Sequence, residues 1–276
     1  MRRHALAVIT TILLIVLPIY APSWAAPLSS AKPWVFSAPP QGSRASQRAL
    51  YNPIAKYLTH VTDHQVIYRD PGNWLTYSQD MTEGKYDLVF DGPHFTSWRD
   101  RYLGDTPLVR VPKRLTFVVM TWHAKKFTRI VQLAGQPVCV LPSPYLGTLA
   151  LLSQFPDVTR QPYLVTIHSF SAAYHGLMTG HCEAAVTLIN NVQRYETGHH
   201  IIHILYRTPA YPNQALSAGP RIPPAIQARI QTALLSPTGE RVTRPLWHFF
   251  GQFIPANRQE YVGLAHLLNN ALYFSR

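Results

Sequence analysis

The chain has 276 residues, of which 47% are hydrophobic and 14% charged, a composition typical of a folded globular protein. The formal net charge is +12, but the lysines and arginines are scattered along the chain. A nucleic-acid-binding protein would gather them in a basic stripe with aromatic platforms, so we exclude nucleic acid as a partner. Two cysteines are too few for a disulfide-rich scaffold or a cysteine metal cluster.

The first residues predict export. Residues 1–4 are positively charged, Ala5–Leu17 form an uncharged apolar run, and the small residues Ser23 and Ala25 suit a signal peptidase. The alternative is a membrane anchor, which needs about 20 apolar residues, and this run is shorter. We therefore expect residues 1–25 to be a cleaved signal peptide and the mature protein to reside in the periplasm, where disulfides can form.

Strands and helices alternate in the first part of the chain. Asn52 and Pro53 are good residues for a helix start, and apolar residues follow them at helical spacing. Asn73 is a second expected cap, and Gly84 suits the left-handed end of that helix. The predicted elements are a strand at 34–37, a helix from Asn52-Pro53, a strand at 65–69, a helix from Asn73 to Gly84 and a strand at 86–90.

The middle of the chain repeats this order. Gly84 and Gly180 each stand three residues before an acid and an apolar strand, although chance similarity of two common turns is an alternative. We interpret the pattern as one β-α-β-α-β unit used twice, which gives an α/β fold of two lobes, each a mostly parallel sheet flanked by helices. The second set is a strand at 137–141, a helix from Gly147-Thr148, a strand at 163–167, a helix from Ser171 to Gly180 and a strand at 183–186.

Two extended segments predict a hinge of two crossings between the lobes. Residues 115–122 are rich in β-branched and aromatic residues and would cross in one direction. Residues 201–206, with the proline-punctuated stretch 208–220, would cross back.

The C-terminal part is expected to be helical, at Pro224–Leu235 and Asn257–Tyr273, and to pack on the first lobe. The predicted division is therefore 33–115 with 221–276 for lobe 1 and 116–220 for lobe 2.

Several segments, taken in order, resemble the phosphonate/phosphite-binding family of periplasmic proteins of ABC transporters, within the type II periplasmic-binding fold. The resemblance covers nearly the whole mature chain. It implies a monomer without a cofactor that captures a small phosphonate-, phosphite- or phosphate-like anion and delivers it to an ABC permease in the inner membrane. The segments that carry it are Asn52–Leu58, Gly84–Leu88, Asp91–Phe95, Leu133–Val138 and Ala172–Val186, with Pro142 and Gly147.

The resemblance also implies where the ligand binds. In such folds ligands lie outside the carboxyl ends of parallel strands, where helix N-termini suit an anion. By position, the site would use residues 37–42 and 91–95 from the first lobe and residues 143–148, 168–170 and 187–190 from the second. The candidate ligand-binding residues are Ser37, His94, Phe95, Ser143, Tyr145, Gly147, Thr148, His168, Ser169 and Asn190.

Some of these positions depart from the family pattern. Pro144, Tyr145 and Leu146 stand where the family usually has hydroxyl side chains, Phe170-Ser171 replaces a histidine–acid pair, and Phe95 replaces a frequent tyrosine. A less polar ligand, or loss of small-ligand binding, is therefore an alternative to a phosphonate.

Other roles stay open for some candidates. His94 could be a ligand donor or a capping histidine, Tyr145 a cavity or a core residue, and Asn190 a ligand-binding amide or a helix cap.

Cysteine and histidine positions leave two further questions. Cys139 and Cys182 fall near adjacent strands of the second lobe and could form a disulfide if their offset is small enough. His199, His200 and His203 have no acidic or thiol partner nearby, so a metal site is not favoured.

The chain has no nucleophile-elbow, P-loop or dinucleotide motif, so we do not expect an enzyme or a cofactor. The main functional hypothesis is a periplasmic solute receptor for an ABC transporter. A sensor or accessory subunit that partners a membrane kinase is the alternative, and an exported hydrolase is a remote one.

Overall fold

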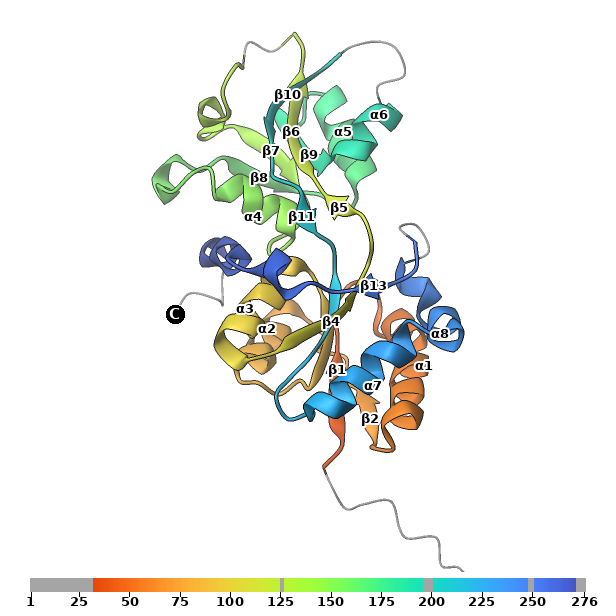
Figure 1. Ribbon diagram of the computed structural model, residues 1–276. Helices are drawn as coiled ribbons and strands as arrows, with labels where there is room; N and C mark the ends of the chain where they lie inside the picture. Colours follow the sequence, from red (N-terminus) through yellow and green to blue (C-terminus); the bar gives the residue numbers. More distant parts are fainter. Residues whose placement is uncertain (1–31, 125–126, 196–200, 248–250, 272–276) are drawn as a thin grey trace, which may run out of the picture. The chain divides into compact units, whose positions relative to one another are not determined.

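Two β-sheets, each with its own helices, organise the chain (Figure 1). The computed structural model describes residues 32–124, 127–195, 201–247 and 251–271. The expected signal peptide and the His199-His200 pair lie outside these ranges. None of the helices within them is both long and apolar enough to cross a membrane.

The six-stranded sheet and its helices form what we call the first lobe. Its strand order is β13-β4-β12-β3-β1-β2, with parallel pairing of β1 to β2 and β3 and antiparallel pairing elsewhere. The strands are β1 (Trp34–Ser37), β2 (Val66–Tyr68), β3 (Leu88–Asp91), β4 (Thr106–Arg110), β12 (Ala215–Ala218) and β13 (Ile254–Pro255). The helices are α1 (Arg44–Thr62), α2 (Trp74–Thr82), α3 (Pro93–Leu103), α7 (Pro224–Leu234) and α8 (Pro237–Trp247).

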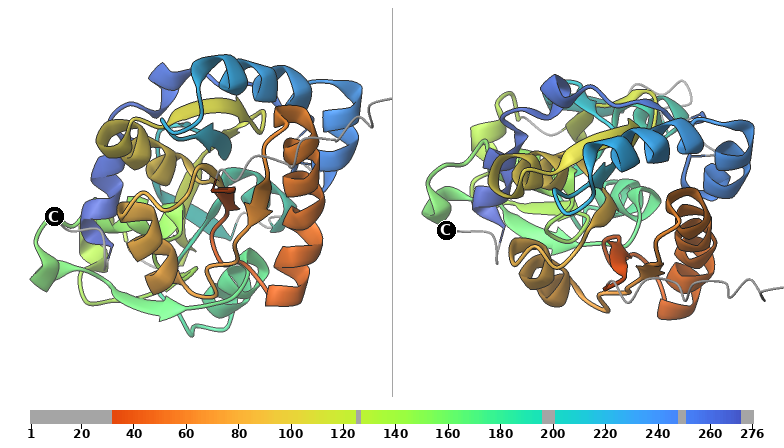
Figure 2. Two further views of the ribbon diagram at one scale, coloured as in Figure 1. Left: turned by 90° about the horizontal axis from the view of Figure 1, so that it is seen from below. Right: turned by 60° about the horizontal axis from the view of Figure 1, so that its bottom comes forward.

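Alternation along β3 explains how this sheet is covered on both faces. Leu88 and Phe90 belong to the core that α1, α7 and α8 share, whereas Val89 belongs to the core under α2 and α3. Successive side chains of a strand point to opposite faces, so Asp91 lies on the same face as Val89. The views of Figure 2 show α1 with α7 and α8 on one side of the sheet and α2 with α3 on the other.

The five-stranded sheet and its helices form the second lobe. Its order is β10-β6-β9-β7-β8, in which β7 pairs in parallel with β8 and β9. The strands are β6 (Phe117–Trp122), β7 (Pro137–Val140), β8 (Tyr163–Thr166), β9 (Ala184–Leu188) and β10 (Ile202–Arg207). The helices are α4 (Leu146–Leu152), α5 (Phe170–Met178) and α6 (Ile189–Tyr195), with the short 3-10 helices η1 (Ile130–Leu133) and η2 (Val158–Arg160).

The predicted repeat is confirmed by strand order, because the first strand of each unit lies between the third and the second. Gly84 and Gly180 adopt the left-handed conformation, with φ of 65° and 73°. Two crossings are present, and they meet as a small antiparallel sheet of β5 (Arg114–Leu115) and β11 (Tyr211–Pro212). The segments 117–122 and 202–207, which were expected to cross, are instead strands of the second lobe's sheet. The α/β architecture of two lobes joined by two crossings is thus as predicted.

Mostly parallel sheets were also predicted, and the strand directions confirm this. In the first lobe β1, β2, β3 and β4 run one way and β12 and β13 run the other way. In the second lobe β7, β8, β9 and β10 run one way and β6 runs the other way. β12 pairs in the first lobe's sheet, although it precedes the boundary at residue 220 expected from the sequence.

The start of the first helix was wrongly predicted at Asn52-Pro53. Helix α1 begins at Arg44, where the Ser43 side chain accepts a hydrogen bond from the Ser46 amide, and Pro53 lies inside the helix. Asn52 and Pro53 are exposed, so the proline ring faces solvent. The Ser43 cap was the stronger signal.

The C-terminal helix predicted at Asn257–Tyr273 is instead two 3-10 helices, η3 (Arg258–Tyr261) and η4 (Leu264–Asn270). Gly263 separates them with φ of 86°, a left-handed conformation that no continuous helix contains. η4 contacts both α3 and α4, and its Ala265 amide donates to the Ser97 hydroxyl at 3.0 Å. The η4 segment therefore touches both lobes.

Cys139 and Cys182 form a disulfide in the second lobe, with Cα atoms 5.7 Å apart. The pairing, which the sequence left open, joins β7 to the turn before β9. Helix α5 lies directly against it, because a Cβ at Gly176 would be 2.6 Å from the Cys139 Sγ. Only glycine fits at that position.

Removing the disulfide should destabilise the protein. The bond closes a loop with a sequence separation of 43 residues. Loop-closure entropy then predicts that the double variant Cys139→Ala/Cys182→Ala loses about 3–4 kcal/mol of unfolding free energy, measured by urea denaturation. Thiol titration of the unreduced, denatured wild type should detect no free thiol. Two free thiols would contradict the pairing.

Candidate ligand-binding cavity

A cavity of about 220 Å³ is lined by residues of both lobes. The first lobe contributes the start of α2 and the turn from β3 into α3, and the second lobe contributes the start of α4 and the end of β9. The lining residues are Pro39, Gln41, Trp74, Gly92, Pro93, His94, Phe95, Leu115, Phe117, Leu141, Pro144, Tyr145, Leu146, Gly147, Thr148, Phe170, Val186, Leu188, Asn213 and Gln214.

Part of the predicted site comes together here. His94 and Phe95 begin α3 on one side, and Tyr145, Gly147 and Thr148 begin α4 on the other. Tyr145 is half-buried, and burial raises the pKa of its hydroxyl.

The other predicted residues do not line this cavity. Ser37 is buried and its hydroxyl donates to the Arg69 carbonyl at 2.9 Å, whereas Ser143 and His168 are exposed. Ser169 caps α5 by accepting from the Ala172 amide, and Asn190 is exposed on α6. Ligand contact by these residues stays a prediction.

Sequence reasoning missed several cavity residues. Trp74 follows the Asn73 cap, whose side chain accepts from the Thr76 amide at 2.9 Å, and could have been noticed for that reason. Phe117 begins β6 and Gln214 lies immediately before β12, and no local pattern marks either as a ligand contact.

Aromatic rings form one wall of the cavity and reach across the lobes. Trp74 stacks on Phe95 with ring centroids 6.0 Å apart, and it meets Tyr145 edge-on at 6.2 Å. Phe95 in turn packs edge-on against the buried Tyr77 at 5.5 Å. This wall therefore joins α2 and α3 of the first lobe to the start of α4 in the second.

His94 makes a polar contact between the lobes. Its Nε2 lies 3.0 Å from the Pro144 carbonyl oxygen, which can only accept, so Nε2 carries the hydrogen. Nδ1 is then an acceptor, and among the described residues it has no partner. Burial lowers the pKa of His94 to about 4, against the opposing effect of Asp91, so the ring is neutral at pH 7.

Two glycines allow side chains to pack closely in this cavity. A Cβ at Gly92 would lie 2.8 Å from the His94 ring, and a Cβ at Gly147 would lie 2.7 Å from the Phe117 ring. The positions of both rings therefore depend on the absence of a side chain on the neighbouring turn.

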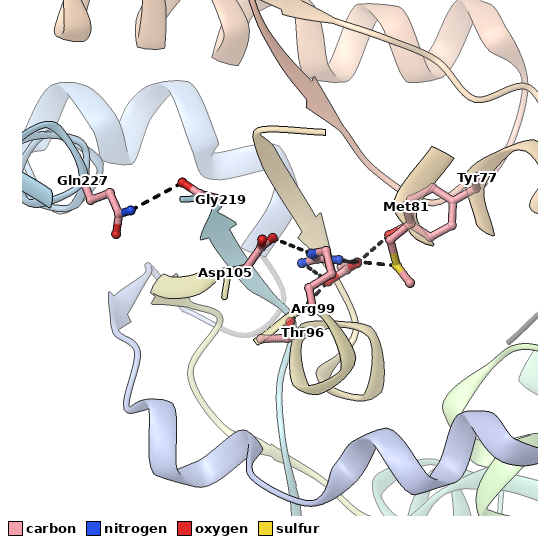
Figure 3. Close-up of polar contacts among 8 residues, drawn as sticks. Tyr77, Met81, Thr96, Arg99, Asp105, Gly219 and Gln227 are labelled. Atoms are coloured by element: carbon pink, nitrogen blue, oxygen red, sulfur yellow. Dashed lines mark hydrogen bonds and ion pairs between the residues drawn. The ribbon is translucent and has the colours of Figure 1, made fainter. Parts of the chain in front are cut away.

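A buried charge cluster around Arg99 lies next to this turn in the chain, and Figure 3 shows its polar contacts. The Arg99 side chain, only 1% exposed, donates from Nε to Asp105 at 2.9 Å and from Nη2 to Asp91 at 3.0 Å, with Nη1 on the second Asp91 oxygen. Tyr77 and Thr96 also donate to Asp91. Asp91 ends β3 immediately before Gly92, so the cluster anchors the cavity turn.

No metal is indicated by the described residues, since no three of their His, Cys, Asp or Glu side chains gather as a binding group.

A family model described as "ABC transporter, phosphonate, periplasmic substrate-binding protein" matches residues 36–261. The match spans most of the chain. The protein belongs to this family of periplasmic substrate-binding proteins of ABC transporters. No curated protein sequence matches the chain.

Solved structures agree on the fold. XAC2383 from Xanthomonas citri bound to ATP has a TM-score of 0.66 at 13% identity, covering 88% of this chain and 100% of that one. PhnD1 from Prochlorococcus marinus in complex with methylphosphonate has a TM-score of 0.59 at 14% identity, covering 86% and 97%.

A binding-protein component of an ABC phosphonate transporter from Pseudomonas aeruginosa has a TM-score of 0.58 at 11% identity, covering 86% of both chains. Likeness at such low identity shows the type II periplasmic-binding fold, as predicted.

Breaking the buried cluster should strongly destabilise the first lobe. Arg99→Met leaves Asp91 and Asp105 buried without their cationic partner, which costs about 3–5 kcal/mol of unfolding free energy. Arg101→Met on the same helix is the matched control, because Arg101 is exposed, and it should change stability by less than about 0.5 kcal/mol. Urea denaturation compares the two. Equal, small effects would contradict the role given to Arg99.

Acid should weaken the fold through His94. Its pKa is about 4 when folded and near 6.5 when unfolded, so the unfolded chain binds more protons between these values. The contribution of His94 to the free energy of unfolding is therefore fully present above about pH 6.5. It is lost on acidification toward pH 4, which lowers the free energy of unfolding by up to about 3 kcal/mol.

The uncharged variant His94→Gln should flatten this part of the stability–pH curve, measured by denaturation from pH 7.5 to 4. The exposed-histidine control His175→Gln should leave the curve unchanged. An unaltered slope in His94→Gln would show that other groups cause the acid loss.

Proposed function

We propose that the protein captures a small solute in this cavity and delivers it to an ABC permease. The observation that carries the proposal is that both lobes supply the lining and touch each other around it, through His94 with Pro144 and Trp74 with Tyr145. The family match agrees with this role.

Closure of the two lobes around the solute is the working motion. The lobes are connected by the β5 and β11 crossings, whose short pairing of Tyr211 with Leu115 is a natural hinge. A ligand that contacts both lobes stabilises the closed arrangement, because it has fewer contacts when they separate.

The role we propose includes no catalytic step. The one cavity histidine donates its Nε2 hydrogen to a backbone carbonyl, and the Thr148 hydroxyl donates to the Leu141 carbonyl at 2.6 Å. Neither arrangement activates a nucleophile, which requires a hydroxyl or thiol bonded to a base.

The proposal also covers the compartment and the oligomeric state of the protein. We place the mature protein in the periplasm after removal of residues 1–25, acting as a monomer toward its permease. An anionic ligand was predicted from the basic charge and the resemblance; the basic surface supports attraction of anions toward the protein, whereas the lining itself bears no cationic side chain.

A ligand screen tests solute capture. Phosphate, phosphite, alkylphosphonates, carboxylates and neutral organic solutes are each added to the mature protein in a thermal-shift assay. Ligand at about a hundred times its dissociation constant adds roughly 2.7 kcal/mol, a Tm rise of roughly 5–10 °C. Small-angle scattering should show a smaller radius of gyration with the same ligand.

Leu188→Trp fills the cavity and should abolish the Tm rise, whereas Val158→Trp, on a side chain 71% exposed and away from the cavity, should keep it. Failure of every solute class to shift Tm or the radius would count against capture and favour a partner-sensing role.

A further inference from the structure

The chemistry of the cavity differs from that of an oxyanion site. None of its lining residues is an aspartate, glutamate, lysine or arginine. Most are aliphatic, aromatic or proline residues, with Trp74, Phe95, Phe117, Tyr145 and Phe170 supplying rings. Such a lining favours apolar surface on the ligand.

The side-chain donors of the lining are uncharged at pH 7, and three of them are engaged elsewhere. The donors of Gln41, Trp74, Tyr145 and Gln214 stay available to a carbonyl or hydroxyl group of a ligand. Thr148 donates to Leu141, and Asn213 donates to the Pro112 carbonyl at 3.2 Å. The Nε2 hydrogen of His94 goes to Pro144, and the remaining ring nitrogen carries a lone pair that repels an anionic oxygen.

The start of α3 is also poor in free amides. Pro93 has no N–H, and the amides of Phe95 and Thr96 both bond the Gly92 carbonyl. A helix start normally offers several such amides to an anion.

The buried cluster of Arg99, Asp91 and Asp105 provides no net positive charge that would attract an anion into the cavity. Arg99 is a buried cation, but its guanidinium faces the two carboxyl groups of Asp91 and Asp105. The cluster therefore has no unpaired positive charge. His94, with its lowered pKa, adds none at neutral pH.

Cavity size limits the ligand further. An apolar protein cavity of about 150 Å³ is large enough to bind benzene. The cavity here, at about 220 Å³, accommodates a ring with a few further atoms.

We propose that the cavity binds an uncharged, largely apolar organic molecule about the size of a substituted single ring, rather than a phosphorus oxyanion. The inference rests on the proposed function, and it names the ligand class of that same site. The aromatic wall of Trp74, Phe95 and Tyr145 faces the ring of the ligand.

A pair of probes that differ mainly in charge tests this inference. Acetophenone and phenylphosphonate carry the same ring, and methylphosphonate is the anion without a ring. Isothermal titration calorimetry on the wild-type mature protein should show acetophenone binding at least tenfold more tightly than phenylphosphonate, with no heat from methylphosphonate.

A charge placed in the cavity should reverse this preference. Leu188→Lys introduces an ammonium at the lining, and should weaken acetophenone at least tenfold while strengthening phenylphosphonate. The matched surface variant Val158→Lys should bind as the wild type does. Circular dichroism verifies that both variants fold. The comparison of acetophenone with the phosphonates on the wild-type protein tests the inference even if a variant does not fold.

The outcomes separate this inference from the proposed function. Tighter binding of either phosphonate by the wild type would overturn the inference and leave solute capture intact. Binding of no probe from either class would overturn the inference and count against capture as well.

Discussion

The buried guanidinium of Arg99 is the constraint on which the candidate ligand cavity depends. A charge in the interior is tolerated only with partners, and Arg99 finds them in Asp91 at the end of β3 and Asp105 just before β4. Helix α3 is thereby tied to both strands. The turn that begins with Gly92 has little freedom, and it presents the His94 ring to the second lobe.

The position of this turn determines which contacts the first lobe makes with the second. His94 reaches the Pro144 carbonyl only because Gly92 leaves room for the ring, and Trp74 reaches Tyr145 over the face of Phe95. The cavity exists where these contacts bring the lobes together. In the proposed function, ligand binding and lobe closure are therefore one equilibrium, since each is favoured by the contacts of the other.

Local features were predictable from the sequence, and long-range ones were not. The Asn73 cap and the left-handed Gly84 and Gly180 are encoded in a few adjacent residues. The Cys139–Cys182 bond and the pairing of Arg99 depend on distances between segments far apart in the chain. For the same reason, the turns after β3 and β7 could be placed near the site, but Phe117 and Gln214 could not.

The departures from the family pattern acquire a common physical meaning in the structure. Phe95, Pro144, Tyr145, Leu146 and Phe170 come from separate segments, yet all of them line one cavity. A single lost hydroxyl would leave a polar ligand short of one hydrogen bond. Replacing several polar side chains together, in a lining without charged residues, instead makes a surface that suits apolar contact with a ligand. The fold supplies the cleft, and these side chains set its chemistry.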